Sequence, residues 1–286
     1  MRGLFRKRGC GLFSLLFFVC VIIVVILLYD SNTRIVTQEY EILHGDIPVS
    51  FDGYRIVLLS DLHNKEFGKD NAKLVEEVRK AQPNIIAFTG DIVEGDGHIG
   101  TAVTLMRRLV EIAPVYYVTG NHEWATTEAR ELIAALRDAG VTVLRSQYET
   151  ITVGDESITL VGLEDANGPA DSKPYEDVFA GLPEAAKDGF IVTLVHRNHL
   201  GDTLAPLGSD LILCGHGHGG TVRLPFTDGL VDHSGFFPTH TNGLYPLGGG
   251  GETSWLLVSR GLGNAYHVPR LLNNPHVAVA VLRSGK

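Results

Sequence analysis

Residues 54–63 read Tyr54-Arg55-Ile56-Val57-Leu58-Leu59-Ser60-Asp61-Leu62-His63. The apolar run in this segment is short, rich in β-branched residues and bounded by polar ones, which predicts a buried β-strand. We expect the strand to end near Ser60 and to place Asp61 and His63 at its carboxyl end. The fold depends on how often this arrangement, an apolar strand followed by polar residues, recurs along the chain.

The arrangement recurs twice in the first half and alternates with helices. The second strand leads into Gly90-Asp91 and the third into Gly120-Asn121-His122-Glu123. We expect strands at 54–60, 84–89 and 115–119, and helices at 71–80, at about 101–112, and from Thr126 or Thr127 to Gly140. This alternation predicts a parallel sheet covered by helices, with ligands bound at the carboxyl ends of the strands. Asp and Asn also favour turns, but three successive strand ends of this kind favour a functional site.

The second half of the chain is richer in strands. A hairpin is predicted around Gly154-Asp155-Glu156, and residues 164–188 are expected to be mostly loop with one helix. The expected strands are 141–144, 150–153, 157–163, 190–195, 211–214, 222–225, 255–259 and 277–282. Two of these strands lead directly into histidines. Strand 190–195 leads into His196, and strand 211–214 leads into Gly215-His216-Gly217-His218.

The Gly-His-Gly-His sequence predicts a metal-binding turn. In extended backbone, His216 and His218 would point to the same side, because side chains alternate along a strand. Glycine lets the backbone turn close to a ligand, and two converging imidazoles are typical transition-metal ligands. A solvated turn is the alternative interpretation. Cys214, just before the turn, is either a further ligand or a buried strand residue, and the frequent burial of free cysteine favours the second.

The N-terminus differs from the rest of the chain and predicts a membrane anchor. Four basic residues (Arg2, Arg6, Lys7 and Arg8) precede an uncharged apolar run at 9–29. A helix needs about 20 apolar residues to cross a bilayer. A cleaved signal peptide has a shorter apolar core and a small-residue cleavage site, which residues 24–30 lack. Because a basic flank favours the cytoplasmic side, the residues after Asp30 are expected to lie outside the cytoplasm.

Charge and cysteine content narrow the possible functions. The net charge of the chain is −9, but residues 30–286 carry 20 Lys and Arg against 33 Asp and Glu, a net charge of −13. This acidic body argues against a nucleic-acid partner, because phosphate backbones are bound mainly through Lys and Arg. The three cysteines do not form a disulfide framework, since Cys10 and Cys20 lie in or beside the apolar run.

Taken in order, the strand ends resemble the signature of the calcineurin-like metallophosphoesterases. That signature runs D-x-H, G-D, G-N-H-E/D, H and G-H-x-H, and each block here follows a predicted strand. The blocks are Asp61-Leu62-His63, Gly90-Asp91, Gly120-Asn121-His122-Glu123, His196 and Gly215-His216-Gly217-His218. The resemblance covers about residues 48–283. It implies an α/β fold, a four-layer α-β-β-α sandwich with two facing mixed sheets, preceded here by one N-terminal transmembrane helix.

The resemblance also implies residue roles at a centre of two divalent transition-metal ions. Mn²⁺ is the expected metal, with Fe and Zn as alternatives, and Asp91 would bridge the two ions. The other ligands would be Asp61, His63 and His218 for the first ion, and Asn121, His196 and His216 for the second. His122 would stabilise charge on the phosphoryl oxygens or protonate the leaving oxygen. Glu123 either orients His122 or is a solvated carboxylate at the start of a helix.

A narrower likeness is to membrane-associated bacterial phosphodiesterases and UDP-2,3-diacylglucosamine pyrophosphatases. The segments that carry it are 56–63, 67–71, 218–225 and 258–263. The chain departs from this branch at Thr221 and His276, where Gln and Glu are typical, and the departures bear on substrate preference rather than on the metal centre.

The resulting prediction is a single-pass enzyme of the cell membrane with an extracytoplasmic catalytic domain. It would hydrolyse phosphodiester or phosphomonoester bonds by attack of a metal-bridged hydroxide, on a cell-envelope or lipid-linked substrate. The alternatives are a catalytically silent, metal-containing envelope-binding protein and a phosphomonoesterase that acts on proteins. The predicted divisions are 1–30 for the cytoplasmic tail and transmembrane anchor, 31–47 for a spacer and first strand, and 48–286 for the catalytic domain.

Overall fold

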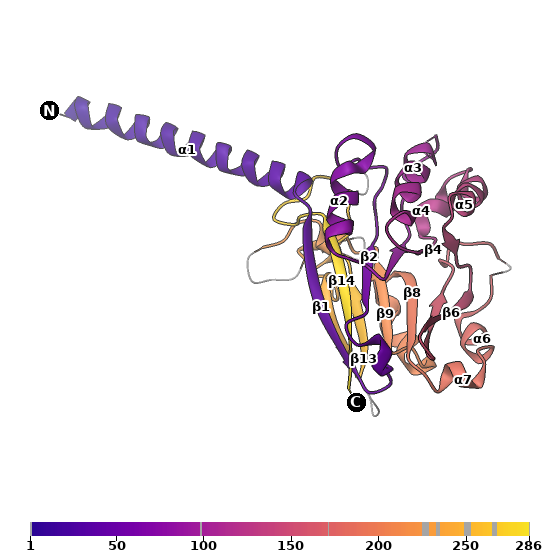
Figure 1. Ribbon diagram of the computed structural model, residues 1–286. Coiled ribbons are helices and arrows are strands. Elements are labelled where there is room, and N and C mark those ends of the chain that lie inside the picture. The colour runs from indigo at the N-terminus through magenta and orange to yellow at the C-terminus, as the bar shows by residue number, and fades with distance from the viewer. Residues whose placement is uncertain are drawn as a thin grey trace.

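Two six-stranded sheets face each other in the computed structural model, with helices on their outer faces and one long helix that leaves the body (Figure 1). The structure describes residues 2–285 apart from 98, 171, 225–228, 233–234, 249–252 and 265–267, and side chains from residue 13 onward. The predicted mixed α/β fold with two mixed sheets and an N-terminal apolar helix is confirmed.

The first sheet contains the three strand–helix units of the first half. Its strands, in spatial order, are β1 (Val36–His44), β14 (His276–Ser284), β2 (Arg55–Leu59), β3 (Ile85–Thr89), β4 (Val115–Val118) and β5 (Thr142–Val143). Strands β2 to β5 are all parallel, whereas β14 is antiparallel to β2 and parallel to β1. The helices of this half are α2 (Ala72–Lys80), α3 (Ile99–Val110), α4 (Asn121–Ala125) and α5 (Ala129–Asp138).

The second sheet is also mixed. Its strands, in spatial order, are β12 (Gly243–Leu247), β13 (Ser254–Val258), β9 (Leu211–Gly215), β8 (Ile191–Arg197), β7 (Glu156–Gly162) and β6 (Gln147–Val153). The four central strands are parallel and both edge strands are antiparallel to their neighbours. Besides short 3-10 helices, the remaining described elements are α6 (Tyr175–Ala180), α7 (Glu184–Lys187), α8 (Gly201–Leu204) and the short pair β10 (Val231–Asp232) and β11 (Gly235–Phe236).

Alternating side chains of the strands build three apolar layers. In β2, Ile56 and Leu58 belong to the cluster between the two sheets, whereas Val57 and Leu59 pack in the cluster with α2, α3 and α5. In β9, Leu213 faces the other sheet and Cys214 packs in the outer cluster with α6 and α8. Burial of both faces explains why these strands are almost entirely apolar. Cys214 is fully buried, as the sequence predicts.

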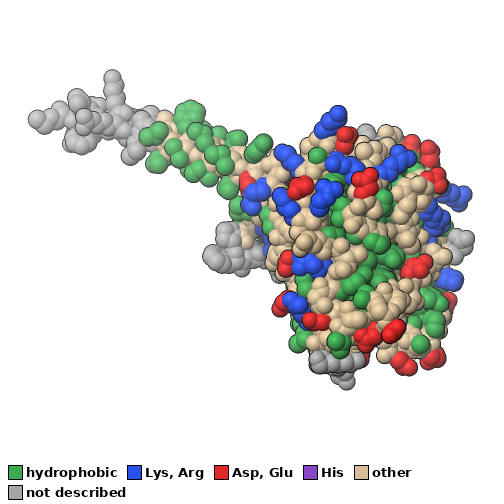
Figure 2. Space-filling model, in the orientation of Figure 1, with side chains coloured by type: hydrophobic (Ala, Val, Ile, Leu, Met, Phe, Trp, Pro, Cys, Tyr) green, Lys and Arg blue, Asp and Glu red, His purple; other side chains and the backbone are tan. Residues whose placement is uncertain are grey.

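Helix α1 (Arg2–Thr33) projects away from the body (Figure 1). Its segment Phe13–Thr33 has a mean hydropathy of 2.8 and is long and apolar enough to cross a membrane. Figure 2 shows hydrophobic side chains along this segment, in contrast to the charged surface of the body. The last turn of the helix is different, because Ser31 is buried and Asn32 hydrogen-bonds to residue 270 of the body.

Four local predictions differ from the structure. Val222 and Arg223 form isolated bridges with Leu271 and Gly229 instead of a strand, and Pro225 lies outside the described residues. Residues 164–188 contain two short helices rather than one. Helix α5 begins after Glu128, so neither Thr126 nor Thr127 caps it. Strand β12 was not predicted, and its Pro246 is tolerated because β12 lies at the sheet edge.

Candidate active site

The carboxyl ends of strands from both sheets converge at one place. Asp61 and His63 follow β2, Asp91 follows β3, and Asn121 and His122 begin α4 directly after β4. His196 lies in β8, while His216 and His218 follow the end of β9. The structure therefore brings together all eight residues that the sequence predicts for the site, from five separate strand ends.

The first group of candidate ligands consists of Asp61, His63 and His218. The Nε2 atoms of the two imidazoles are 3.2 Å apart. Oδ1 of Asp61 lies 3.5 Å from Nε2 of His218 and 4.0 Å from Nε2 of His63. One donor atom from each residue lies within 4.8 Å of the others, a spacing that could hold a metal ion.

The second group contains Asp91, His196 and His216 and is joined by Asn121. Nε2 of His196 lies 3.1 Å from Oδ2 of Asp91 and 3.0 Å from Nδ1 of His216. It also lies 3.1 Å from Oδ1 of Asn121. Two nitrogen and two oxygen atoms thus surround a second point that could hold a metal ion.

Asp91 connects the two groups. Its Oδ2 is 3.1 Å from Nε2 of His196 in the second group and 3.8 Å from Nε2 of His63 in the first. Its Oδ1 accepts a hydrogen bond of 2.8 Å from the backbone N–H of His122. Because Asp91 is 1% exposed, its carboxylate is directed at the site rather than at solvent.

The backbone at five of these residues has a positive φ. Asp61, His63, Asp91, His216 and His218 have φ values between 47° and 68°. Non-glycine residues rarely adopt this left-handed region, and such conformations concentrate at functional sites. The extended conformation that we expected for the His216–His218 pair is therefore wrong. The turn separates the two imidazoles, and each belongs to a different group.

Two glycines of the sequence blocks are required by close packing around the carboxylates. A Cβ on Gly120 would lie 2.2 Å from Oδ1 of Asp91, and a Cβ on Gly215 would lie 2.3 Å from Oδ2 of Asp61. Any side chain at either position would displace a carboxylate of the site. Because these two glycines have no side chain, they leave room for the carboxylates of Asp91 and Asp61.

Hydrogen bonds behind the imidazoles fix the direction of their ligating nitrogens. Nδ1 of His196 is 2.7 Å from the carbonyl oxygen of Thr89, so a proton on Nδ1 leaves Nε2 free to bind a metal. Nδ1 of His63 is 3.3 Å from Oε2 of Glu94, which can orient His63 in the same way. Glu94 was missed because it belongs to no sequence block; its position three residues after Asp91 was the available signal.

Glu123 has a different role from both interpretations of the sequence. It is fully buried, so it is not a solvated carboxylate. Its Oε2 accepts hydrogen bonds from the backbone N–H groups of Asp91 and Gly120, at 2.8 and 2.6 Å. Its Oε1 accepts one of 2.8 Å from Ile92 and a longer one of 3.4 Å from Val93. Glu123 therefore holds the loop that carries Asp91 against the start of α4, rather than the imidazole of His122.

His122 lies over the candidate metal site. Its ring packs edge-to-face against the ring of His63, with centroids 4.6 Å apart, and its Nε2 is 3.9 Å from Oδ2 of Asp91. Burial lowers the pKa of His122, and the Asp91 carboxylate offsets this only in part. The imidazole is positioned to donate a hydrogen bond to an anion held at the site.

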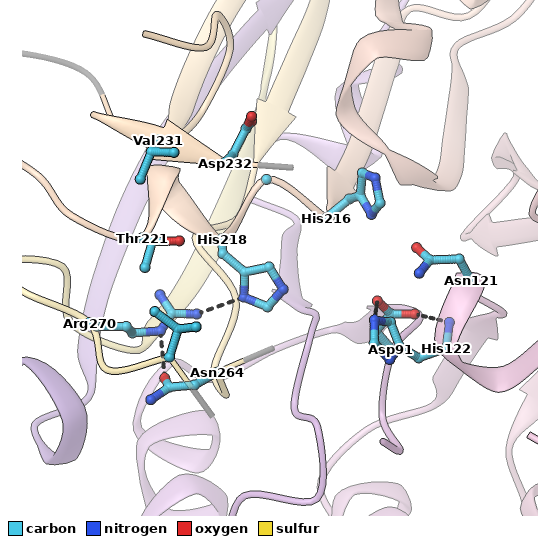
Figure 3. Close-up of a pocket in the computed structure, with 12 residues that line it drawn as sticks. Asp91, Asn121, His122, His216, His218, Thr221, Val231, Asp232, Asn264 and Arg270 are labelled. Carbon is cyan, nitrogen blue, oxygen red and sulfur yellow. Dashed lines mark hydrogen bonds and ion pairs between the residues drawn. The ribbon is translucent and has the colours of Figure 1, made fainter. Parts of the chain in front are cut away.

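A cavity of about 340 Å³ opens on the site and contains an arginine that the sequence did not indicate. Figure 3 shows Arg270 and Asn264 on the side of this cavity next to His218, opposite Asn121 and His122. Arg270 is 1% exposed, and burial lowers its pKa to about 10, so the guanidinium is protonated at neutral pH. No sequence block or spacing marks this residue.

The donor atoms fit two divalent transition-metal ions. They are imidazole nitrogens, carboxylate oxygens and an amide oxygen, a set that suits Mn, Fe or Zn. The buried imidazole of His196 already has its second nitrogen on a backbone carbonyl, as metal-binding histidines usually do. Cys214 is not part of either group, because its Sγ lies 3.7 Å from the carbonyl oxygen of Leu257 in the outer core.

Comparison with known families agrees with the geometry. Residues 54–220, more than half of the chain, match the family described as calcineurin-like phosphoesterase. The chain belongs to this family of metal-dependent phosphoesterases, whose members use a dimetal centre. The class predicted from the sequence is confirmed.

Individual relatives cover the chain to different extents. The uncharacterized metallophosphoesterase YkuE of Bacillus subtilis is 29% identical over 90% of this chain and 88% of its own. The phosphodiesterase YaeI of Escherichia coli is 30% identical over 60% of this chain and 63% of its own. A zebrafish protein named transmembrane protein with metallophosphoesterase domain is 24% identical over 73% of this chain. This chain spans only 53% of that relative's length.

A solved structure supports the fold alone. The NAD nucleotidase NadN of Haemophilus influenzae superimposes with a TM-score of 0.50 at 18% sequence identity. The match covers 73% of this chain and 45% of that one.

Proposed function

We propose that this chain is a membrane-anchored phosphodiesterase with two divalent transition-metal ions. The observation that carries the proposal is the pair of ligand groups joined by Asp91 at one cavity. Asp61, His63 and His218 would hold one ion together with Asp91. Asn121, His196 and His216 would hold the other, also with Asp91. Two such ions would act as Lewis acids on the phosphoryl oxygens and lower the pKa of an attacking water.

The residues around the ions would position and stabilise the reacting phosphate. His122 would donate a hydrogen bond from its imidazole to a phosphoryl oxygen as negative charge develops there, or protonate the leaving oxygen. Its place on the ring of His63 and above Asp91 supports both roles. Glu123 would position Asp91 and Asn121, because it accepts hydrogen bonds from the backbone N–H of Asp91 and from that of Gly120, which precedes Asn121.

The N-terminal helix supports a location at the cell membrane. Its apolar segment Phe13–Thr33 follows a basic stretch, which would place the N-terminus in the cytoplasm and the body outside. A relative named transmembrane protein with metallophosphoesterase domain supports the location at a membrane. We propose the divisions 1–30 for tail and anchor, 31–47 for spacer and first strand, and 48–286 for the catalytic domain. A substrate in the cell envelope, lipid-linked or derived from a wall polymer, fits this location.

The preference for a diester rests on likeness and is directly testable. A relative of the chain is named a phosphodiesterase. The full-length protein, purified in detergent and loaded with Mn²⁺, is expected to hydrolyse bis-p-nitrophenyl phosphate faster than p-nitrophenyl phosphate. The reverse order of rates would establish a phosphomonoesterase instead. Bound metal and bound inorganic phosphate without turnover of either ester would establish a catalytically silent binding protein.

A further inference from the structure

Arg270 is a fully buried cation whose hydrogen bonds are incomplete. Its Nε donates to the carbonyl oxygen of Gly263 at 3.0 Å and to Oδ1 of Asn264 at 3.1 Å, and its Nη2 donates to the same Gly263 oxygen. Its Nη1 is buried and has no hydrogen-bond partner among the described residues. A buried donor without a partner costs free energy, so this nitrogen is poised for a ligand.

The position of the guanidinium indicates which ligand it would bind. Arg270 lines the cavity over the candidate metal centre, and its Nη2 lies 3.3 Å from Nδ1 of His218. That contact is a hydrogen bond only when Nδ1 accepts. If His218 binds a metal through Nε2, the proton of its ring resides on Nδ1. The N–H of Arg270 Nη2 that points at Nδ1 then has no acceptor there. The forked N–H groups of arginine match the oxygens of a phosphate.

The last turn of α1 holds the segment that carries Arg270. Oδ1 of Asn32 accepts hydrogen bonds from the backbone N–H of Arg270 at 3.1 Å and from Nδ2 of Asn264 at 2.8 Å. Nδ2 of Asn32 donates to the carbonyl oxygen of Arg270 at 2.9 Å. Asn32 thus fixes the backbone of Arg270. It also holds the side chain of Asn264, whose Oδ1 accepts a hydrogen bond from Nε of Arg270.

Neighbouring residues reinforce this connection. Oγ of Ser31 accepts a hydrogen bond of 2.8 Å from the backbone N–H of Leu272. Nδ2 of Asn274 donates to the carbonyl oxygen of Asp30 at 2.8 Å. The turn at 30–32 is therefore joined to 270–274 by hydrogen bonds of the two residues that precede Asn32 as well as by those of Asn32 itself.

We propose that Arg270 is a phosphate-binding residue of this cavity and that Asn32, in the last turn of α1, is its positioning residue. The N-terminal helix is then part of the phosphate site as well as an anchor. The inference rests on the proposed function in one respect only, the presence of the metal ions. It does not require turnover.

The test is the affinity of inorganic phosphate for the full-length, Mn²⁺-loaded protein in detergent, measured by calorimetry after the bound metal has been counted. Arg270→Met removes the charge and keeps an apolar side chain of similar length. Because hydrogen bonds to charged groups are strong, the Kd of phosphate is expected to rise at least about tenfold while two metal ions stay bound. A Kd within about twofold of wild type, with two metal ions bound, would overturn the proposal.

A second pair of variants tests the proposal even if Arg270→Met does not fold. Asn32→Ala is expected to raise the Kd of phosphate about three- to tenfold, because it removes neutral hydrogen bonds that position Arg270. Thr33→Val is the matched control in the same helical turn, since Oγ1 of Thr33 donates to the carbonyl oxygen of Tyr29 within the helix. Equal phosphate affinity in both variants would contradict the positioning role. Failure to bind metal in the wild type would instead contradict the proposed function.

Discussion

The two ligand groups of the site differ in what lies behind their imidazoles. In the second group, Nδ1 of His196 faces a backbone carbonyl, that of Thr89. In the first group, Nδ1 of His63 faces the carboxylate of Glu94, and Nδ1 of His218 faces the guanidinium of Arg270. A backbone carbonyl is fixed by the sheet, whereas charged side chains can move and can be replaced.

The difference extends to burial. The imidazole of His196 is 0% exposed, whereas the side chain of His218 is 14% exposed and borders the cavity. His196 is therefore held by a carbonyl of the first sheet, whereas His63 and His218 are oriented by charged side chains that line cavities. We infer that changes around the first group alter one metal ion, while changes at the shared carboxylate alter both.

Replacement of the shared carboxylate should have the largest effect. Asp91→Ala removes the only carboxylate that reaches both groups among the described residues. We expect bound metal to fall from two ions per chain to none and turnover of bis-p-nitrophenyl phosphate to become undetectable. Metal analysis of the purified variant, with circular dichroism as the folding control, checks this. Retention of either ion at full occupancy would show that Asp91 does not join the groups.

His122→Ala should separate catalysis from metal binding. Its imidazole belongs to neither of the two proposed ligand groups, so two metal ions should remain bound. Because acid–base and hydrogen-bond contributions of this kind are typically about 10²–10⁴-fold, kcat should fall by that range. Steady-state kinetics and metal analysis of the same preparation give both quantities. A loss of metal equal to the loss of rate would make His122 a ligand.

Glu94→Ala should weaken one ion selectively. Partners behind metal-binding histidines typically change metal affinity about 10–100-fold, and Glu94 stands behind His63 of the first group alone. A Mn²⁺ titration should therefore resolve one unchanged site and one weakened site. Glu66→Ala is the matched control, because Glu66 is exposed and lines, together with Glu94, a second cavity beside His63. Equal weakening of both sites would remove the distinction between the groups.

Glu123→Gln should mainly affect stability. The carboxylate of Glu123 accepts hydrogen bonds from four backbone N–H groups, and an amide in its place would direct its NH₂ at some of them. We expect the free energy of unfolding to fall by about 2–4 kcal/mol. Glu131→Gln, on the exposed face of α5, should change it by less than about 0.5 kcal/mol. Denaturant titration of the metal-free proteins measures both changes.

The convergence of the candidate ligands could be predicted from the sequence because each of them depends on local features. Asp61, Asp91 and His196 each lie at or just beyond the end of an apolar strand, and strand ends of parallel sheets meet at one edge. The left-handed turn at His216 and His218 could not be predicted, because the flanking glycines allow several conformations. The strand expected at 222–225 is wrong within the described residues, where Val222 and Arg223 form isolated bridges instead.

Contacts between segments that are distant in the chain could not be predicted from the sequence. Arg270 and Asn32 are far apart in the chain, and nothing in either neighbourhood indicates that they meet. Glu94 and Glu123 are common surface residues by type, and only the fold shows that one faces His63 and the other is fully buried. Residues that act by positioning another residue belong to no motif of fixed spacing, so the sequence does not reveal them.

The central claim is that two groups joined by Asp91 hold two metal ions for phosphodiester hydrolysis. The most direct test is a Mn²⁺ titration of the full-length, metal-free protein, with bound metal and turnover of bis-p-nitrophenyl phosphate measured at each point. The account predicts two ions bound per chain at saturation, with turnover that rises as the second site fills. Saturation at one ion or none, or turnover that is complete before the second ion binds, would contradict it.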